Sequence, residues 1–599
     1  MQACVLPSIG QHAPIPNADT PISVSVAMEL DMGLQRAKPG KATHPPPVSN
    51  PQSTHTRQTA CRFGNLCVCC LACTPVKISP LLALLEQYPP RAQAEKLQTG
   101  FTQGFRLGFI GPRIGRDAPN LQSVRQRTQM ALEKLDKEVS LGRMAGPFTT
   151  PPFENLCISP IGLVPKAEAG HFRLIHHLSY PEAESVNDGI DKSQCSVKYS
   201  NFDDALHLVM KAGKGSLLAK ADIKSAFRLL PINPSDFCLL GIKVQDRIYV
   251  DKTLPMGASC APAFFEAFST FLEWATIRRS GLRGICHYAD DFLFVGGSEA
   301  TSPSSCKALL QSFKDTCQLL GVPLAEEKTV EPTSRLSFLG LDIDSAALTV
   351  FVPHDKLSKI QGKIQEALSS DKITLRALQS LIGSLAFVCR AVAPGRAFLR
   401  RLIDLTRGIR KAWHLIRLSA GAKEDLRTWH FFLRNFNGKA IIPDQFWVLD
   451  SDVQLFTDAS GGSGFGGYFN GQWFAAPWPP DVKAKGHSIA WLEFLPVVVA
   501  ITLWGQRLGG RRVIIRSDNE AVVAIINKQT SRCSSIMRLV RYFVLRCLHD
   551  NVAFKAQHIP GVHNEIADAL SRSQISRFRR LAPTAAAQGL PIPTFVWKL

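Results

Sequence analysis

Two adjacent carboxylates stand between two apolar runs in the segment 285–296, which reads Ile-Cys-His-Tyr-Ala-Asp-Asp-Phe-Leu-Phe-Val-Gly. Apolar runs on both sides of a short polar pair are typical of a β-hairpin, and its tight turn would carry Asp290 and Asp291. Clustered carboxylates are costly unless cations neutralise them. Mg²⁺ is the expected cation, because it prefers carboxylate oxygens and keeps positions open for phosphate oxygens. The pair therefore indicates metal-dependent phosphoryl transfer.

A third acid, Asp222, ends a second predicted strand, 217–222. Two-metal phosphoryl transfer needs ligands that bridge two ions about 3.5–4 Å apart. Asp222 and Asp290 would meet this need if their strands are neighbours. The chain has another acidic pair, Asp203-Asp204, but it precedes a predicted helix over 205–211 and lacks apolar strand flanks. We interpret that pair as the N-terminal acids of a helix.

These elements occur in an order that resembles reverse transcriptases. The segments that carry the resemblance are 162–166, 171–175, 217–222, Leu-Pro-Met-Gly at 254–257, Tyr-Ala-Asp-Asp at 288–291, 325–329 and the expected primer-grip hairpin 337–341. An amphipathic helix predicted over 372–392 falls where a thumb belongs.

The resemblance also implies a role for individual residues. It makes Asp222, Asp290 and Asp291 catalytic metal ligands. It implies that the nucleotide is bound by Lys166 and Arg173 at the triphosphate, Phe227 at the sugar 2′ position, Met256 and Gly257 beside the template, and Lys328 at the pyrophosphate. A bulky ring beside the sugar excludes a 2′-hydroxyl, so Phe227 predicts selection of deoxynucleotides.

A second set of four acids lies further along the chain. Asp458 and Asp518 each end a predicted strand, Glu493 lies in the apolar helix candidate 489–503, and Asp568 lies in a predicted helix near the C-terminus. This order resembles the RNase H fold, and four acids around two Mg²⁺ ions suit phosphodiester hydrolysis. Many relatives carry a histidine before the last acid. Of His558 and His563, the second is the better candidate.

The whole resemblance implies an α+β multidomain chain, with a right-hand polymerase followed by an α/β RNase H-like domain. We expect disorder over 1–75, a helical extension over 76–145, fingers and palm over 146–345, a helical thumb or connection over 346–450, the RNase H-like domain over 451–575, and a basic, Pro-containing tail over 576–599. A cysteine cluster could bind zinc, but its spacing is not that of a zinc finger. Its members are Cys61, Cys67, Cys69, Cys70 and Cys73.

Charge and composition agree with a polyanionic partner. The 599 residues contain 69 Lys+Arg against 49 Asp+Glu, a net charge of +20. A solubility charge or one basic tail is the alternative interpretation. The expected partners are an RNA template, a DNA primer, the RNA–DNA hybrid and dNTPs, with two Mg²⁺ or Mn²⁺ ions per active site. We expect no membrane span and no secretory signal, and hence an intracellular protein of cytoplasm or nucleus.

Several stretches, among them 152–156, 172–181, 269–275 and 378–383, resemble the DIRS-like group of tyrosine-recombinase retrotransposons, with gypsy-like and pararetroviral polymerases next. A domesticated or decayed copy that binds nucleic acid without catalysis is an alternative, although all seven acids are present. An RNA-dependent RNA polymerase is disfavoured by Phe227 and by the nuclease-like segment.

Overall fold

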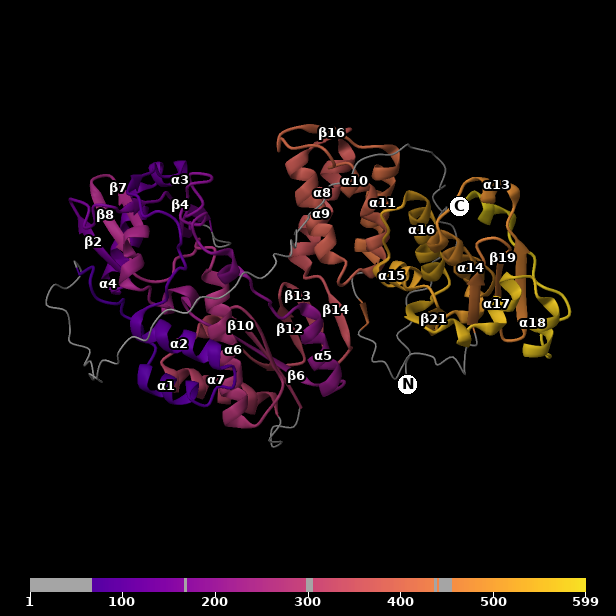
Figure 1. Ribbon diagram of the computed structural model, residues 1–599, viewed down its shortest axis with the longest axis horizontal. Coiled ribbons are helices and arrows are strands. Elements are labelled where there is room, and N and C mark those ends of the chain that lie inside the picture. Colours follow the sequence, from indigo (N-terminus) through magenta and orange to yellow (C-terminus); the bar gives the residue numbers. More distant parts are fainter. Residues whose placement is uncertain (1–66, 166–169, 298–304, 436–438, 441–454) are drawn as a thin grey trace, which may run out of the picture. The chain divides into compact units, whose positions relative to one another are not determined.

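The computed structural model describes residues 67–165, 170–297, 305–435, 439–440 and 455–599, and its mixed α/β architecture confirms the predicted fold class (Figure 1). These residues divide into two compact units, one up to Leu339 and one from Leu348 onward, which divide the short segment 340–347 between them. The expected helical extension therefore belongs with the fingers and palm. The expected thumb and nuclease-like segments together form the second unit.

The first unit alternates short strands with longer helices. Its elements are α1 Ile78–Leu85, α2 Arg91–Gln103, β1 Arg116–Asp117, α3 Gln122–Arg125, α4 Thr128–Ser140, β2 Met144–Phe148, β3 Cys157–Ile158, β4 Ile161–Pro165, β5 Phe172–His176, α5 Phe202–Ala212, β6 Leu217–Asp222, β7 Gly241–Val244, β8 Arg247–Asp251, α6 Ala261–Ser280, β9 Ile285–Tyr288, β10 Asp291–Gly296, α7 Cys306–Leu320, β11 Val330–Thr333 and β12 Arg335–Phe338. The segment 122–140 forms two successive helices, α3 and α4.

A four-stranded antiparallel sheet in the order β11-β6-β10-β9 forms the centre of this unit. Helices α6 and α7 contact it, and the ring of Phe313 on α7 packs 4.5 Å from Phe292 and 5.2 Å from Phe294 of β10. All three rings are fully buried. This aromatic layer stabilises β10 and thereby holds the end of the strand that begins with Asp291.

The first unit contains two further sheets. One has the order β1-β3-β7-β8-β2, and the other is the hairpin of β4 and β5, in which Val164 pairs with Arg173. The hairpin is the expected fingers element. Lys166 follows it and lies outside the described residues.

Helices α1 and α2 share the palm's hydrophobic core rather than forming a separate extension. Leu81, Leu85, Leu97 and Phe101 are all at most 2% exposed and belong to the same cluster as the palm. The ring of Phe101 lies 5.0 Å from that of Phe268 on α6. The boundary expected near residue 145 therefore does not separate two cores.

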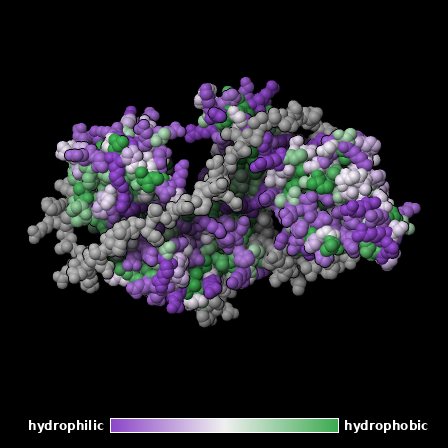
Figure 2. Space-filling model, viewed as in Figure 1, coloured by the Kyte–Doolittle hydropathy of each residue, from purple (hydrophilic) through white to green (hydrophobic). Residues whose placement is uncertain are grey.

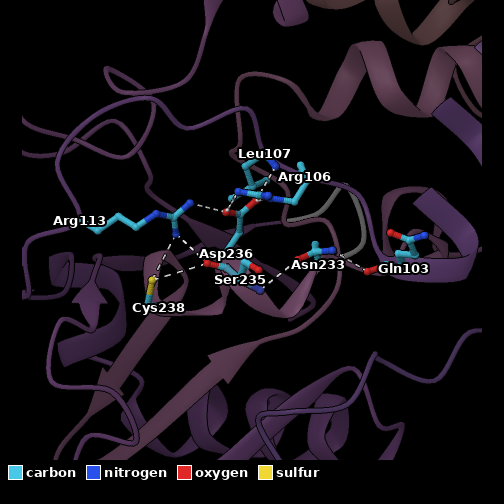
Figure 3. A network of polar contacts seen from close by, with 8 residues as sticks. All are labelled: Gln103, Arg106, Leu107, Arg113, Asn233, Ser235, Asp236 and Cys238. Atoms are coloured by element: carbon cyan, nitrogen blue, oxygen red, sulfur yellow. Dashed lines mark hydrogen bonds and ion pairs between the residues drawn. The ribbon is translucent and has the colours of Figure 1, made fainter. Parts of the chain in front are cut away.

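A buried carboxylate ties the segment after α2 to the palm (Figure 3). Asp236 is fully buried and accepts hydrogen bonds from Arg106 Nε at 3.0 Å, Arg113 Nη2 at 2.5 Å and the Leu107 backbone N–H at 2.8 Å. Burial alone would raise the pKa of Asp236, but the two arginines outweigh it and lower that pKa below its usual value. Three donors thus compensate for the burial of this charge.

The expectation of disorder over 1–75 is wrong for its last residues, whereas 1–66 lie outside the described residues. In the segment 67–77 the Thr74 hydroxyl donates to the Leu229 carbonyl at 2.8 Å, and the Cys73 N–H donates to the Gly142 carbonyl at 3.2 Å. These hydrogen bonds to distant parts of the first unit order the segment 67–77, and its sequence alone did not indicate them.

The second unit is helical at first and then mixed. Its elements, with the bridging strand β13 Leu341–Asp344, are β14 Thr349–Phe351, α8 His354–Ser369, β15 Lys372–Thr374, α9 Leu375–Val388, α10 Arg400–Asp404, β16 Leu415–Arg417, α11 Ala420–Asn435, β17 Lys439–Ala440, β18 Leu455–Ala459, β19 Gly464–Phe469, β20 Gln472–Pro477, α13 Pro480–Ala484, α14 Ile489–Trp504, β21 Arg512–Ser517, α15 Glu520–Lys528, α16 Ser534–His549, β22 Ala553–His558, α17 Glu565–Ser571 and α18 Ile575–Leu581.

The helix expected over 372–392 is shorter than predicted. Lys372–Thr374 form β15, which pairs with β16, and the Thr374 hydroxyl then accepts from the Ala377 N–H as the cap of α9. Leu375 and Leu378 are buried, as the periodicity predicted. The β-branched pair Ile373-Thr374 suits a strand followed by a cap better than a helical turn.

Ion pairs join the helical part of this unit to its nuclease-like part. Asp425 on α11 is 1% exposed and lies 3.0 Å from Arg401 Nη1 on α10 and 3.6 Å from Arg541 Nη2 on α16. Burial raises the pKa of Asp425 to about 6, against the opposing effect of the two arginines. The contact explains why residues 348–435 and 455–599 form one compact unit.

Helix α14 lies in the core of the nuclease-like part, against β18, β19 and α16. The stretch Ile489–Leu508 has 20 residues and is apolar enough to cross a membrane by length and composition, although no membrane span was expected. However, 72% of its most apolar window is buried inside the unit. A helix that is apolar all round and covered by protein is typical of a core helix.

The C-terminal residues 576–599 are not a separate tail. Phe578 on α18 is fully buried in a cluster with Tyr468, and the Trp473 indole N–H donates to the Ala586 carbonyl at 2.8 Å. Arg579 lies over the ring of Trp473 at 5.5 Å. The basic residues of this stretch thus take part in packing, beyond a solubility role.

Surface hydrophobic residues are scattered rather than gathered. Hydrophilic residues cover most of the face seen in Figure 2, and hydrophobic ones form small separate patches. The most exposed apolar side chains of the described residues, Ile110, Trp413 and Val562, are far apart in the sequence. Scattered exposed apolar side chains of this kind are normal for a globular protein.

We predict that Asp236→Asn lowers the free energy of unfolding of the first unit by about 3–5 kcal/mol, because it breaks a buried ion pair. Asp117→Asn is the matched control, since Asp117 is half exposed and pairs with the exposed Lys243 at 2.5 Å. That change should cost about 0–1 kcal/mol. Denaturant unfolding followed on the first unit's transition checks both values, and equal losses in the two variants would contradict the role of Asp236.

Candidate active sites

Register in the palm sheet brings Asp222 and Asp291 together. Asp222, the last residue of β6, pairs directly with Asp291, the first residue of β10. Asp290 occupies the turn between β9 and β10, one residue before Asp291. The three acids predicted from the sequence therefore lie at one end of two neighbouring strands.

The turn that carries Asp290 is held by backbone hydrogen bonds on both sides. Ala289 has a φ of +52°, and its N–H donates to Glu266 Oε2 on α6 at 3.2 Å. The Asp290 carbonyl accepts from the Ile223 N–H at 3.1 Å, directly after β6. A non-glycine residue in the left-handed region is strained, and these bonds offset that cost.

Two lysines neutralise the acid cluster. Lys328 Nζ lies 2.9 and 3.0 Å from the two oxygens of Asp222, and Lys220 Nζ lies 2.9 Å from Asp291 Oδ1. Partial burial opposes the charged form of Lys328, but its bonds with Asp222 outweigh this and raise its pKa above the usual value. Lys328, which was predicted at the pyrophosphate, thus lies beside the acids, whereas the sequence prediction did not include Lys220. Its place two residues before Asp222 on one strand, and hence on one face, was the available indication.

The electrostatics of Asp290 reflect crowding of negative charge. Burial raises the pKa of Asp290, and the charges of Asp222 and Asp291 raise it further, against a smaller opposing effect from Lys328. A raised carboxyl pKa among other carboxylates is typical of a site prepared for cations. The donors are hard carboxylate oxygens, which suit Mg²⁺ or Mn²⁺.

A buried triad that the sequence did not reveal supports this hairpin. His287 on β9 is 4% exposed; its Nδ1 lies 2.6 Å from Glu273 Oε2, and its Nε2 lies 3.2 Å from Glu266 Oε1. Burial opposes the charged imidazolium, but the two glutamates outweigh it and raise the pKa of His287 to about 9. Glu266 thus binds both the His287 imidazolium and the Ala289 N–H in the turn that carries Asp290.

The predicted nucleotide-binding residues lie in the same unit. Phe227 is half-buried in a 3₁₀ turn that follows β6, and its ring packs edge-on to Phe265 at 5.4 Å. Gly257 has a φ of +143°, and a Cβ there would collide with the His176 carbonyl at the end of β5. Asn187 Nδ2 donates to the Gly257 carbonyl at 2.8 Å. Only glycine suits this approach of two backbones. Met256, beside it, is half-buried, and Arg173 is exposed on β5.

Three of the four acids predicted for the second site come together. Single oxygens of Asp458 on β18, Glu493 on α14 and Asp518 after β21 all lie within 4.8 Å of one another. Burial, followed by the charges of Asp458 and Asp518, raises the pKa of Glu493 to about 9. Burial also raises the pKa of Asp458 to about 6, although the Ser571 hydroxyl donates to it at 2.5 Å. This group also offers only carboxylate oxygens.

Asp568 differs from the other three acids. Its two oxygens lie 2.6 Å from Arg572 Nε and 2.6 Å from Arg577 Nη1, and these bonds lower its pKa despite the opposing effect of burial. Among the described residues the expected four-acid group is therefore a three-acid group. Asp568 on α17 is held by Arg572, directly after α17, and by Arg577 on α18.

The loop before Asp568 carries the two candidate histidines. His563 is exposed, whereas His558 Nε2 lies 3.2 Å from the Asp518 carbonyl. Asn564, which the sequence prediction passed over, is 1% exposed and donates to the Thr457 carbonyl at 3.0 Å. Asn564 therefore fixes the start of α17 against the strand that carries Asp458.

Comparisons with known proteins agree with the first site. Residues 164–343 match the family model described as reverse transcriptase (RNA-dependent DNA polymerase). Polyprotein P3 of Commelina yellow mottle virus is 23% identical over 65% of this chain and 19% of its own length. The enzymatic polyprotein of cauliflower mosaic virus (strain Strasbourg) is 22% identical over 62% of this chain and 52% of its length, and protein P of duck hepatitis B virus (strain China) is 26% identical over 28% and 20%.

The chain thus spans about a fifth to about half of the curated relatives it matches. Among solved structures, a foamy viral protease-reverse transcriptase in complex with dsDNA is 16% identical, covers 81% of this chain and 98% of its own, and gives a TM-score of 0.45. The matched residues 164–343 contain β5 to β12 and all three acids of the first site. These residues form a reverse transcriptase domain whose homologues occur in the polyproteins of caulimoviruses and hepadnaviruses.

Proposed function

We propose that the chain is an RNA-directed DNA polymerase with RNase H activity, which copies a retroelement RNA into DNA and degrades the RNA of the resulting hybrid. The single observation that carries the polymerase part is the register that sets Asp222 opposite Asp291, with Asp290 in the adjoining turn. This is the arrangement in which three carboxylates can share two metal ions. The family match over the same residues supports the proposal.

Each acid group would hold Mg²⁺ or Mn²⁺, because both groups offer carboxylate oxygens alone. When bound, the ions would activate a primer 3′-hydroxyl at the first group and a water molecule at the second, and would neutralise phosphate oxygens at both.

The chain's own cations complete the polymerase site. Lys328 forms an ion pair with Asp222, and its side chain is 57% exposed. If a metal ion neutralises Asp222, the Lys328 ammonium can instead neutralise a phosphate oxygen. We propose that Lys166 and Arg173 act on the triphosphate from the fingers hairpin, as the resemblance implies. Met256 and Gly257 would border the nucleotide and the template.

The RNase H part of the proposal depends on Asp458, Glu493 and Asp518. Burial raises the carboxyl pKa values of Glu493 and Asp458, as it does for Asp290 in the palm. Asp568 lies on the adjacent helix α17. We propose that Asp568 joins the group when Arg572 and Arg577 turn to the phosphates of a bound hybrid, because arginine binds phosphate and carboxylate in the same bidentate way.

The remaining proposals concern partners and origin. A net charge of +20 supports binding of an RNA template, a DNA primer and their hybrid. We propose membership of the DIRS-like group from the motifs alone, since the curated relatives are pararetroviral. An intracellular location stays a prediction.

Asp290→Asn should lower the rate of dNTP incorporation on a primed RNA template by about 10²–10³-fold, because a metal ligand worth several kcal/mol is lost. Hybrid cleavage in the same preparation should persist, and Asp518→Asn should give the opposite result. Asp203→Asn is the control, since Asp203 belongs to the exposed acidic pair at the start of α5. Synthesis that persists in the Asp290 variant would refute the assignment of the palm site.

Phe227→Ala should admit ribonucleotides, since the ring would no longer exclude a 2′-hydroxyl. We expect the ratio of kcat/KM for dGTP over GTP to fall by about 10-fold or more, which is about 1.4 kcal/mol of discrimination. Phe595→Ala, at an exposed phenylalanine of the second unit, should leave the ratio unchanged. A Phe227 variant that still rejects GTP would remove the steric role.

Glu493 predicts a dependence of stability on metal and pH. Its pKa in the fold is about 9, whereas its ordinary value is 4.5. Between these pH values the carboxyl ionises in the unfolded chain but stays protonated in the fold. The free energy of unfolding therefore falls as pH rises from 4.5 toward 9. At pH 8, Mg²⁺ should raise the unfolding midpoint of the second unit by about 2–4 °C for each kcal/mol of binding.

The matched substitution Glu493→Gln should raise the metal-free midpoint at pH 8 and remove the Mg²⁺ shift. Glu520→Gln, at an exposed acid in the first turn of α15, should change neither. Differential scanning calorimetry measures both quantities. A lower metal-free midpoint in the Glu493 variant would show that its carboxyl is not under the inferred repulsion.

A further inference from the structure

Three cysteine thiols gather in the segment that precedes α1, outside both acid sites. One sulfur each from Cys67, Cys69 and Cys70 lies within 4.8 Å of the others. The Cys67 and Cys69 sulfurs are 3.1 Å apart, and those of Cys69 and Cys70 are 3.8 Å apart. The cysteine spacing is not that of a zinc finger, but the backbone conformation of residues 67–70 brings these three sulfurs together.

These separations suit a shared metal ion. Tetrahedral Zn²⁺ with Zn–S bonds of about 2.3 Å places its sulfur ligands about 3.8 Å apart. The Cys69–Cys70 separation has this value, whereas the Cys67 and Cys69 sulfurs, 3.1 Å apart, must separate by about 0.7 Å. Cys67 is buried, Cys70 is half-buried and Cys69 is exposed, so water can reach the fourth position from the Cys69 side.

Disulfide formation explains the cluster less well. Neighbouring Cα atoms such as those of Cys69 and Cys70 lie about 3.8 Å apart, below the range of about 4.4–6.8 Å found across disulfides. Any bridge within the group would also leave its third sulfur out, whereas a metal ion takes all three. Thiolates are the ligands that Zn²⁺ prefers over the carboxylates of the acid sites.

The segment around the cluster lies as a strap across the palm. The Cys73 N–H and the Thr74 hydroxyl donate to the Gly142 and Leu229 carbonyls, and the Lys77 N–H donates to the Leu320 carbonyl at 2.8 Å. Leu229 ends the 3₁₀ turn that carries Phe227. A metal ion at residues 67–70 would fix the local conformation of the start of this segment, whose later part is held by these hydrogen bonds and by the buried Val76 side chain.

We propose that Cys67, Cys69 and Cys70 bind one Zn²⁺ ion, which cross-links the segment 67–70 ahead of its hydrogen bonds to the palm. Each thiol loses its proton to solvent as its sulfur binds, so three protons leave and no electron is transferred. Cys73 is left out of the proposed ligand set, because its sulfur does not belong to the group of three and lies beside Gly142.

Metal analysis of the full chain tests this site. Protein produced with added zinc and then exchanged into excess Mg²⁺ should retain about one zinc per chain. The double variant Cys69→Ser/Cys70→Ser, which leaves the buried Cys67 in place, should retain less than about a tenth of that amount. Cys73→Ser is the matched control from the same strap and should keep its zinc.

Cadmium substitution gives a second readout that the acid sites cannot produce. Cd²⁺ bound to thiolates has an ultraviolet charge-transfer band, which wild-type and Cys73→Ser protein should show and the double variant should lack. Circular dichroism checks that the double variant is folded. Zinc-free wild-type protein, zinc retained in the double variant, zinc lost from Cys73→Ser, or no thiolate band would each overturn the proposal.

Discussion

Mutual repulsion among carboxylates is the constraint on which the reverse transcriptase domain depends. Antiparallel register sets Asp222 against Asp291, and a two-residue turn adds Asp290. Lys220 and Lys328 offset the charge of two of these acids, while the pKa of Asp290 rises through burial and then the charges of Asp222 and Asp291. The remaining repulsion destabilises the fold and is relieved when cations bind. The same feature that lowers the stability of the fold therefore favours cation binding at the site.

The surrounding structure compensates for this burden. The buried ring of Phe313 on α7 packs against two rings of β10. Glu266 links α6 to the turn through the Ala289 N–H. The positively charged His287 lies between Glu266 and Glu273. Its charge offsets much of the repulsion that these two glutamates would add near the acid cluster. The second unit meets the same constraint differently, because Glu493 and Asp458 there have raised pKa values rather than lysine partners.

Sequence patterns revealed the parts of the sites that depend on local order. The apolar flanks of Asp290-Asp291 and the strand ending at Asp222 predicted the hairpin and its neighbour, and the order of acids predicted the group of Asp458, Glu493 and Asp518. Partners distant in sequence were not predictable in this way. Glu266 meets His287 because α6 packs on β9, Trp473 meets Ala586 through tertiary packing, and Asp568 is held by arginines that its spacing did not single out.

Primer extension by the purified wild-type chain is the most direct test of the central claim that this acid cluster makes DNA on RNA. A DNA primer annealed to RNA and given Mg²⁺ with dNTPs should be extended to the end of the template, and EDTA should stop the reaction. Extension with NTPs in place of dNTPs, or no extension on RNA under conditions where the protein is folded and binds the primed template, would contradict the account.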